Sequence, residues 1–309
     1  MKKLTVSLTV TVIAILLAAP ALALETKLSG FYNLHPLINN FAASNNYIGT
    51  FADDAKTESV IDQRFRAKFD AIVNEYLAFT YYAEIDMQWG DAQYSTARND
   101  GGGIGGDTVN IETKNLLIDI KVPETTSAFR LGLQWFADNY DSTLFDTDMA
   151  GIRYEGDFGV FDLTAGWYKL IEGNVDIADD VNLWGLQLGF EPSDTFDFGV
   201  DYYYYQNQGS QEYATFFGTA DITAILNFNA GGGDWTANRE DMDLHYIGGH
   251  AAYQFGSFAL SGWLNTNFGT VESINNTTAA PDLTEDLDVQ GYAARLTLDS
   301  TFGNFKLRL

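Results

Sequence analysis

The sequence contains no cysteine, only five prolines and few basic residues. Without thiols the chain forms no disulfide, no thiolate metal site and no covalent haem attachment. The chain has 17 lysines and arginines but 42 aspartates and glutamates. This balance excludes a nucleic-acid binder, because phosphate recognition depends on Lys and Arg. Beyond residue 23 no stretch approaches 18 uninterrupted apolar residues, so an inner-membrane helical protein is excluded as well.

The first 23 residues have the pattern of a secretory signal peptide. Lys2 and Lys3 precede an apolar run over residues 4–17, and Ala21 and Ala23 are small residues at the positions that a signal peptidase reads. The run is short for a membrane anchor, and no basic stop-transfer cluster follows it. We expect cleavage after Ala23, which leaves a mature chain with 15 basic and 42 acidic residues and a net charge of −27.

Aromatic residues, by contrast, are plentiful, and they fall in long segments that alternate with a period of two. The chain has 22 Phe, 17 Tyr and 6 Trp. In residues 61–71, apolar side chains such as Phe65 and Phe69 alternate with Arg64, Arg66 and Lys68, which predicts a strand with one apolar and one charged face. A shift of the strand register by one residue would turn each of these basic side chains toward lipid. Each would then destabilise the folded protein by roughly 2–4 kcal/mol near a bilayer midplane. A soluble β-sandwich with a solvated face is the alternative.

The same alternation recurs along the mature chain and predicts 13 strands. Long breaks follow the odd-numbered strands and tight turns follow the even-numbered ones, as in outer-membrane barrels. We therefore expect an all-β, transmembrane antiparallel up-and-down β-barrel over residues 24–309. Such barrels have even strand numbers, so we also expect a C-terminally incomplete chain and about 14–18 strands in the complete protein. The predicted strands cover residues 27–35, 61–71, 77–89, 108–122, 129–135, 152–154, 161–167, 184–190, 196–204, 247–253, 258–264, 292–298 and 305–309.

With its signal peptide, paired long strands, Phe-Gly turns at 156–159 and 255–257 and acidic loops, the chain resembles Gram-negative outer-membrane porins. The segments 62–77 and 135–151 are similar to the porin-like family of anaerobic metal-reducing bacteria. The resemblance implies a non-enzymatic, water-filled channel without a cofactor, for passive diffusion of small hydrophilic solutes and ions across the outer membrane. Two alternatives stay open: the barrel sheath of a porin–cytochrome electron conduit, and an exporter of acidic polysaccharide that resembles alginate-export barrels.

The charged positions of the strands are the candidate pore-lining residues. They can form a constriction field that selects ions, or ion pairs that neutralise the charges along a wet lumen. The basic members are Arg64, Arg66, Lys68, Arg130, Arg153 and Arg295. The acidic members are Asp62, Asp70, Glu84, Asp86, Asp119, Glu155, Asp162, Asp197 and Asp201.

The third long loop, residues 137–148, is the candidate constriction loop, because by resemblance to general porins it folds inward. Its acidic residues are then expected to oppose the basic ladder, which is formed by Arg64, Arg66 and Lys68. The alternative is an ordinary surface loop. These residues are Asp138, Asp141, Asp146 and Asp148.

The remaining expectations concern selectivity and partners. Acidic loops predict a negative outer mouth that favours cations, and no loop has the spacing of a dedicated calcium site. Tyr203 and Tyr205 fit either an interfacial aromatic girdle or a surface that stacks sugars. The expected partners are outer-membrane lipid and lipopolysaccharide, the barrel-assembly machinery, small hydrophilic solutes and, for a homotrimer, further copies of the chain; nucleic acid is not among them.

Overall fold

The computed structural model of the chain describes residues 24–39, 58–91, 101–106, 109–172, 180–208, 235–236, 241–276, 284–302 and 305–308. The predicted signal peptide lies outside these residues. Within them the protein is built from strands, and no helix there is long and apolar enough to cross a membrane. The chain divides into two compact units, Met1–Ile118 and Asp119–Leu309, which are described separately.

The first unit contains β1 (Glu25–Asn39), β2 (Glu58–Asn74) and β3 (Leu77–Gln88); β4 (Glu112–Lys121) begins in this unit and ends in the second. β2 pairs antiparallel with both β1 and β3. The β2–β3 turn is tight because the Asn74 side chain accepts a hydrogen bond from the Tyr76 backbone N–H at 2.8 Å.

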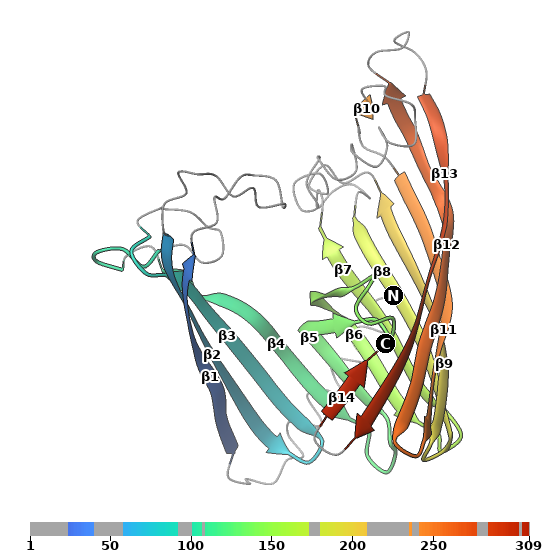
Figure 1. Ribbon diagram of the computed structural model, residues 1–309, viewed down its shortest axis with the longest axis horizontal. Coiled ribbons are helices and arrows are strands. Elements are labelled where there is room, and N and C mark those ends of the chain that lie inside the picture. Colours follow the sequence, from blue (N-terminus) through green and yellow to red (C-terminus); the bar gives the residue numbers. More distant parts are fainter. Residues whose placement is uncertain are drawn as a thin grey trace, which may run out of the picture. The chain divides into compact units, whose positions relative to one another are not determined.

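The second unit is an antiparallel sheet in which β9 is followed by β11 (Figure 1). Each strand on this path pairs with the next one. The two-residue β10 (Trp235–Thr236) lies off the path and pairs with β12. The strands on the path are β5 (Ala128–Ala137), β6 (Asp146–Asp157), β7 (Asp162–Ile171), β8 (Val181–Ser193), β9 (Phe196–Gln208), β11 (Asp241–Phe255), β12 (Phe258–Asn276), β13 (Thr284–Phe302) and β14 (Phe305–Arg308).

The structure confirms the predicted all-β, antiparallel up-and-down sheet and, in the described part of the chain, the 13 strands of its pairing path; β10 is an additional short strand. Short turns alternate with longer connections, as expected. The turn after β6 shows how the sequence encodes them: Asp157 accepts the Gly159 N–H at 2.7 Å, and Gly159 has a φ of 77°.

Several strand boundaries differ from the predictions. β12 and β13 are 19 residues long and enter the region 267–285 that was expected to be a loop. Their pairing continues through Thr270 and Asp288 to a bulge after Val271, because ladder hydrogen bonds do not require apolar side chains. β10 lies within the interval 207–241 that was expected to be a loop, and β6 begins at residue 146 rather than near 152.

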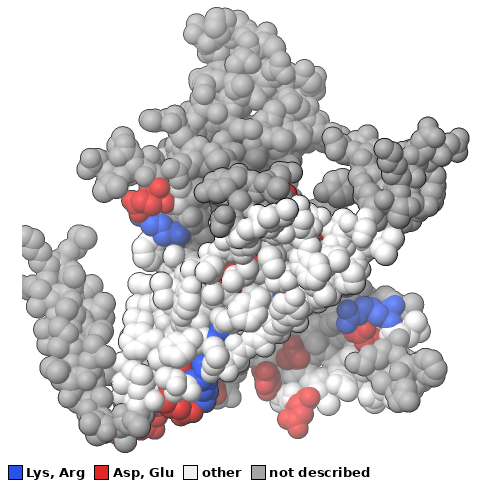
Figure 2. All heavy atoms as spheres, turned by 90° about the vertical axis from the view of Figure 1, so that its left-hand side faces the viewer, with Lys and Arg blue, Asp and Glu red and all other residues white. Residues whose placement is uncertain are grey.

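Each sheet has two chemically different faces. We call the face with Phe65 and Phe69 in the first unit, and with Trp135 and Leu264 in the second, the apolar face; the face with Arg64 and Arg153 is the polar face. The alternation of side chains along each strand keeps the two apart. The apolar face leaves large side chains exposed, including Leu264 at 59% and Leu296 at 74%. In the view of Figure 2 the described residues form a broad uncharged area, with charged side chains gathered mainly toward its margins.

Two rows of aromatic rings border the apolar face of the second unit. Near the loop ends of the strands, Tyr204 stacks on Trp184 at 5.1 Å and on His245 at 4.8 Å. Near the turn ends, Phe198 stacks on Phe190 at 4.9 Å. Tyr204 and Phe198 are six residues apart on β9, which corresponds to about 20 Å along a strand. Further members of the two rows are Phe268 for the first and Phe161, Phe196, Tyr253, Phe255 and Phe258 for the second.

Candidate functional site

In the first unit the charges of β2 and β3 meet across the strands. The register places Arg64 opposite Asp86 and Arg66 opposite Glu84. Arg64 donates to both oxygens of Asp86, at 2.8 and 2.6 Å, and lies 3.4 Å from Glu84, which also accepts from Arg66. Glu84 is fully buried and Asp86 is 5% exposed, so the arginines cover these carboxylates.

The ladder continues toward the turn. Lys68 lies 3.2 Å from Asp70, which also accepts a hydrogen bond from Thr80 at 2.6 Å. The guanidinium of Arg66 packs near the rings of Phe31 and Tyr82. The basic ladder is therefore held by three carboxylates and by aromatic rings, and its charges balance.

In the second unit the polar face begins with a smaller group of charges. Arg130 donates to Asp119 at 2.7 Å, and Arg153 lies 2.5 Å from Glu155. The register sets Arg130 directly opposite Arg153. Like charges in that position repel, so the two carboxylates are needed to hold the arginines there.

Of three further predicted acidic residues, Asp162 and Asp197 lie at the ends of their strands, and Asp62 lies within β2. Asp62 is opposite His35 and Gln88 in the first unit. In the second unit, Asp162 is opposite Gly189 and Asp197 is opposite Ala252. Asp162 and Asp197 are exposed and lie beside turns.

The loop between β5 and β6, residues 138–145, is organised by one carboxylate. Asp138 accepts hydrogen bonds from the backbone N–H groups of Tyr140, Leu144 and Phe145, at 2.7, 2.6 and 2.6 Å. Asp141 at the tip of this loop has a φ of 55°, a left-handed conformation that non-glycine residues seldom adopt. Such strain persists only where the surroundings fix it.

These surroundings are provided by the far strands of the same unit. Asn139 donates to Asp201 on β9 at 2.8 Å. Asp141 accepts from Trp263 on β12 at 2.8 Å and from Arg295 on β13 at 2.9 Å. The loop thus folds back across the polar face of the sheet.

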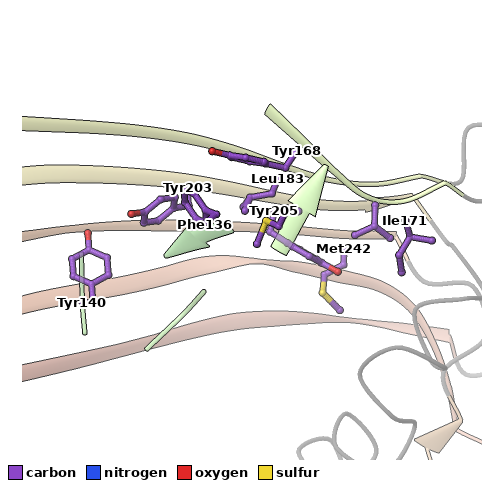
Figure 3. Close-up of a cluster of buried hydrophobic side chains, with 10 residues drawn as sticks. Phe136, Tyr140, Tyr168, Ile171, Leu183, Tyr203, Tyr205 and Met242 are labelled. Atoms are coloured by element: carbon purple, nitrogen blue, oxygen red, sulfur yellow. The ribbon is translucent and has the colours of Figure 1, made fainter. Parts of the chain in front are cut away.

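A buried aromatic and aliphatic cluster lies on the polar face beneath this loop (Figure 3). Phe136 packs on Tyr168 at 4.9 Å, and Tyr203 meets Phe136, Tyr140 and Phe145 edge to face. The cluster consists of Phe136, Tyr140, Met149, Tyr168, Ile171, Val181, Leu183, Tyr203, Tyr205 and Met242.

The cluster corrects one hypothesis from the sequence. Tyr203 is fully buried and Tyr205 is 6% exposed, so they do not present a surface for stacking sugars. The alternation that places Arg130 and Asp201 on the polar face places Phe136 and Tyr203 on the same face. These aromatic residues at polar-face positions were the sign in the sequence that a buried cluster lies there.

Two of the four candidate loop aspartates were placed wrongly. Asp146 and Asp148 belong to β6, because the loop ends at Phe145. Asp146 accepts a hydrogen bond from the Trp135 indole at 2.8 Å, and Asp148 is opposite Trp135 in the register. Both therefore lie at the loop end of the apolar face, away from the polar face.

Asp201 and His250 form a buried polar contact that the sequence did not reveal. Asp201 is fully buried, and its carboxylate lies 3.1 Å from His250 Nδ1. Gly199 makes room for this ring, since a Cβ there would be 2.3 Å from it. Burial raises the pKa of the Tyr140 hydroxyl in the adjacent loop, and Asp201 adds to this shift, so Tyr140 stays neutral at physiological pH.

The described residues contain no cluster of three or more His, Cys, Asp or Glu that could hold a metal ion. The chemistry of the polar face is therefore that of paired charges, buried aromatic rings and a folded loop.

No family model matches the chain, and no curated protein matches it either. Among solved structures it is similar to a loop-deletion form of OmpT, an outer membrane protein of Vibrio cholerae, with 13% identity, 93% of this chain and 92% of that chain covered, and a TM-score of 0.38. A porin refined at 1.8 Å is similar with 12% identity, 92% of each chain covered and a TM-score of 0.39. A variant of the Rh. blastica porin is similar with 8% identity, 89% of this chain and 98% of that chain covered, and a TM-score of 0.34. Likeness at this level carries no argument about function.

Proposed function

We propose that this chain is an outer-membrane porin, a water-filled channel for the passive diffusion of small hydrophilic solutes and ions. The observation that carries the proposal is the division of the sheet into two faces. Paired charges and a folded loop occupy one face, and exposed apolar side chains between two aromatic rows occupy the other.

The apolar face fits a lipid environment. Apolar surface in water costs about 25 cal/mol per Å², and the exposed side chains on this face are large, including Ile152, Leu264 and Leu296. Inside the sheet each strand is paired on both sides, which satisfies the backbone polar groups there as a bilayer requires. The two aromatic rows lie where a barrel carries its interfacial girdles.

The polar face fits the wall of an aqueous pore. Loop 138–145 narrows that pore by lying across the wall, and its tip carries the exposed carboxylate of Asp141. With a formal net charge of −25 for the whole chain, we propose a preference for cations. The basic ladder of the first unit tempers this preference rather than reverses it, since its charges are paired.

Localisation and partners follow from the same proposal. The chain is exported through its signal peptide, is inserted by the barrel-assembly machinery, and contacts lipid and lipopolysaccharide through the apolar face. Association as a homotrimer would cover part of that face.

Conductance of the full-length protein in planar bilayers tests the function. The protein, folded in detergent, should give discrete single-channel steps in KCl and a reversal potential of cationic sign under a salt gradient. A chain that folds without detergent and produces no channel would end the proposal.

A further inference from the structure

Three buried polar atoms on neighbouring strands of the second unit have no hydrogen-bond partner among the described residues. They are Gln134 Oε1 on β5, Arg153 Nε on β6 and Tyr168 Oη on β7. Gln134 and Tyr168 are fully buried. Buried polar groups are nearly always paired, so three such atoms in one region indicate a bound group.

The three side chains gather along one stretch of β6 and its two neighbouring strands. Arg153 is opposite Gly166 in the register, and a Cβ at Gly166 would lie 2.8 Å from the Tyr168 hydroxyl. The Tyr168 ring also covers Gly151, whose carbonyl oxygen is 3.4 Å from the Gln134 side-chain nitrogen. Glycines at these positions let both side chains lie flat along the strands.

The unpaired donors of this region suit an anion, because Arg153 Nε and Tyr168 Oη each carry a hydrogen. Arg130 and Arg153 face each other across β5 and β6, and one carboxylate holds each of them. The side chains of Arg130 and Glu155 are 36% and 43% exposed, so a small ion that displaces them can approach from the polar face.

We propose that Gln134, Arg153 and Tyr168 bind an oxyanion that also carries a proton donor, of which hydrogen phosphate is the simplest. The anion accepts hydrogen bonds from Arg153 Nε–H and Tyr168 Oη–H, and its own P–OH donates to Gln134 Oε1. Sulfate has the same shape but no proton to donate at neutral pH, and it leaves the Gln134 oxygen unpaired. The site rests on the proposed function in that the anion reaches it from the pore. It would give a channel of acidic composition one binding site for phosphate.

Single-channel recordings test the site with inorganic phosphate and sulfate added to KCl at pH 7 and matched ionic strength. Phosphate should lower the chloride-salt conductance saturably, and sulfate should need about a tenfold higher concentration, because one hydrogen bond to a charged ligand is lost. Tyr168→Phe keeps the ring and removes the hydroxyl, and Arg153→Lys keeps the charge and removes the Nε donor. Each should raise the apparent Kd for phosphate about tenfold. Arg308→Lys, on a strand remote in the pairing order, is the matched control and should leave it unchanged.

The outcomes separate the site from the channel. A conducting protein that shows no saturable phosphate effect, equal effects of the two anions, or equal Kd values in all variants would overturn the site and leave the porin intact. If no channel forms, titration calorimetry of the detergent-folded protein with phosphate decides: saturable binding that Tyr168→Phe weakens supports the site, and its absence overturns it. Heat-dependent gel migration verifies that each variant is folded.

Discussion

Asp141 and Arg295 are 154 residues apart in the sequence, yet their side chains meet at 2.9 Å and join the tip of loop 138–145 to β13. Asp141 also accepts the Trp263 indole N–H. Asp141 is therefore the point at which the loop is fastened to the far strands of its own unit.

Removing this contact should free the loop tip. Asp141→Asn removes the ionic partner of Arg295, which is worth about 1 kcal/mol or less because both side chains are well exposed. We expect more frequent transitions and a larger mean single-channel conductance, with the unfolding midpoint almost unchanged. Asp146→Asn is the control, since Asp146 pairs with Trp135 on the other face. Identical traces for the two variants would contradict the fastening role.

Asp138 should matter more than Asp141, because it shapes the loop from within. Its carboxylate accepts three backbone N–H groups and is 7% exposed. Asp138→Ala leaves these donors unpaired, at about 1–3 kcal/mol each. We expect the loop to leave the polar face, to become cleavable by protease and to raise the conductance, as measured by limited proteolysis and bilayer recordings. A loop that stays resistant would show that the aromatic contacts of Tyr140 and Phe145 suffice.

The basic ladder of β2 should influence both stability and selectivity. Arg66→Gln leaves the fully buried Glu84 without its main partner, an imbalance that costs about 3–5 kcal/mol for a buried pair. We expect a lower urea midpoint, and the double variant Arg66→Gln/Glu84→Gln should recover most of the loss. Replacing Arg64, Arg66 and Lys68 together by Gln should also shift the reversal potential toward cations. An unchanged reversal potential would show that paired charges leave no field in the pore.

Arginine substitutions at two depths along the apolar face test whether this face lies in a bilayer. Leu264 lies between the two aromatic rows of β12, whereas Phe268 is a member of the row at the loop ends. Leu264→Arg should destabilise the folded protein by about 2–4 kcal/mol in lipid, and Phe268→Arg by about 0–1 kcal/mol beyond the loss of its ring contact. Equilibrium unfolding in lipid vesicles measures both. Equal costs at the two depths would favour a soluble sheet.

The period-two alternation predicted the strands and their two faces because it is a local property of the backbone. Phe65 and Arg64 must leave opposite faces wherever the strand lies. The ends of β12 and β13 were missed because polar residues there still pair through their backbones. The position of loop 138–145 was open for a different reason. It depends on contacts such as that of Asn139 with Asp201, 62 residues away. The loop sequence has no periodicity from which such long-range contacts can be predicted.

The length of β12 and β13 has a consequence outside the bilayer. Each has 19 residues, and a tilted strand needs only about 9–11 to cross the hydrocarbon. In a membrane the surplus of roughly eight residues would extend the strands by about 25 Å, measured along their own axis, beyond the hydrocarbon. The ribbon formed by this surplus would be accessible to bacteriophages, antibodies or neighbouring cells, and it is a suitable place to insert an epitope.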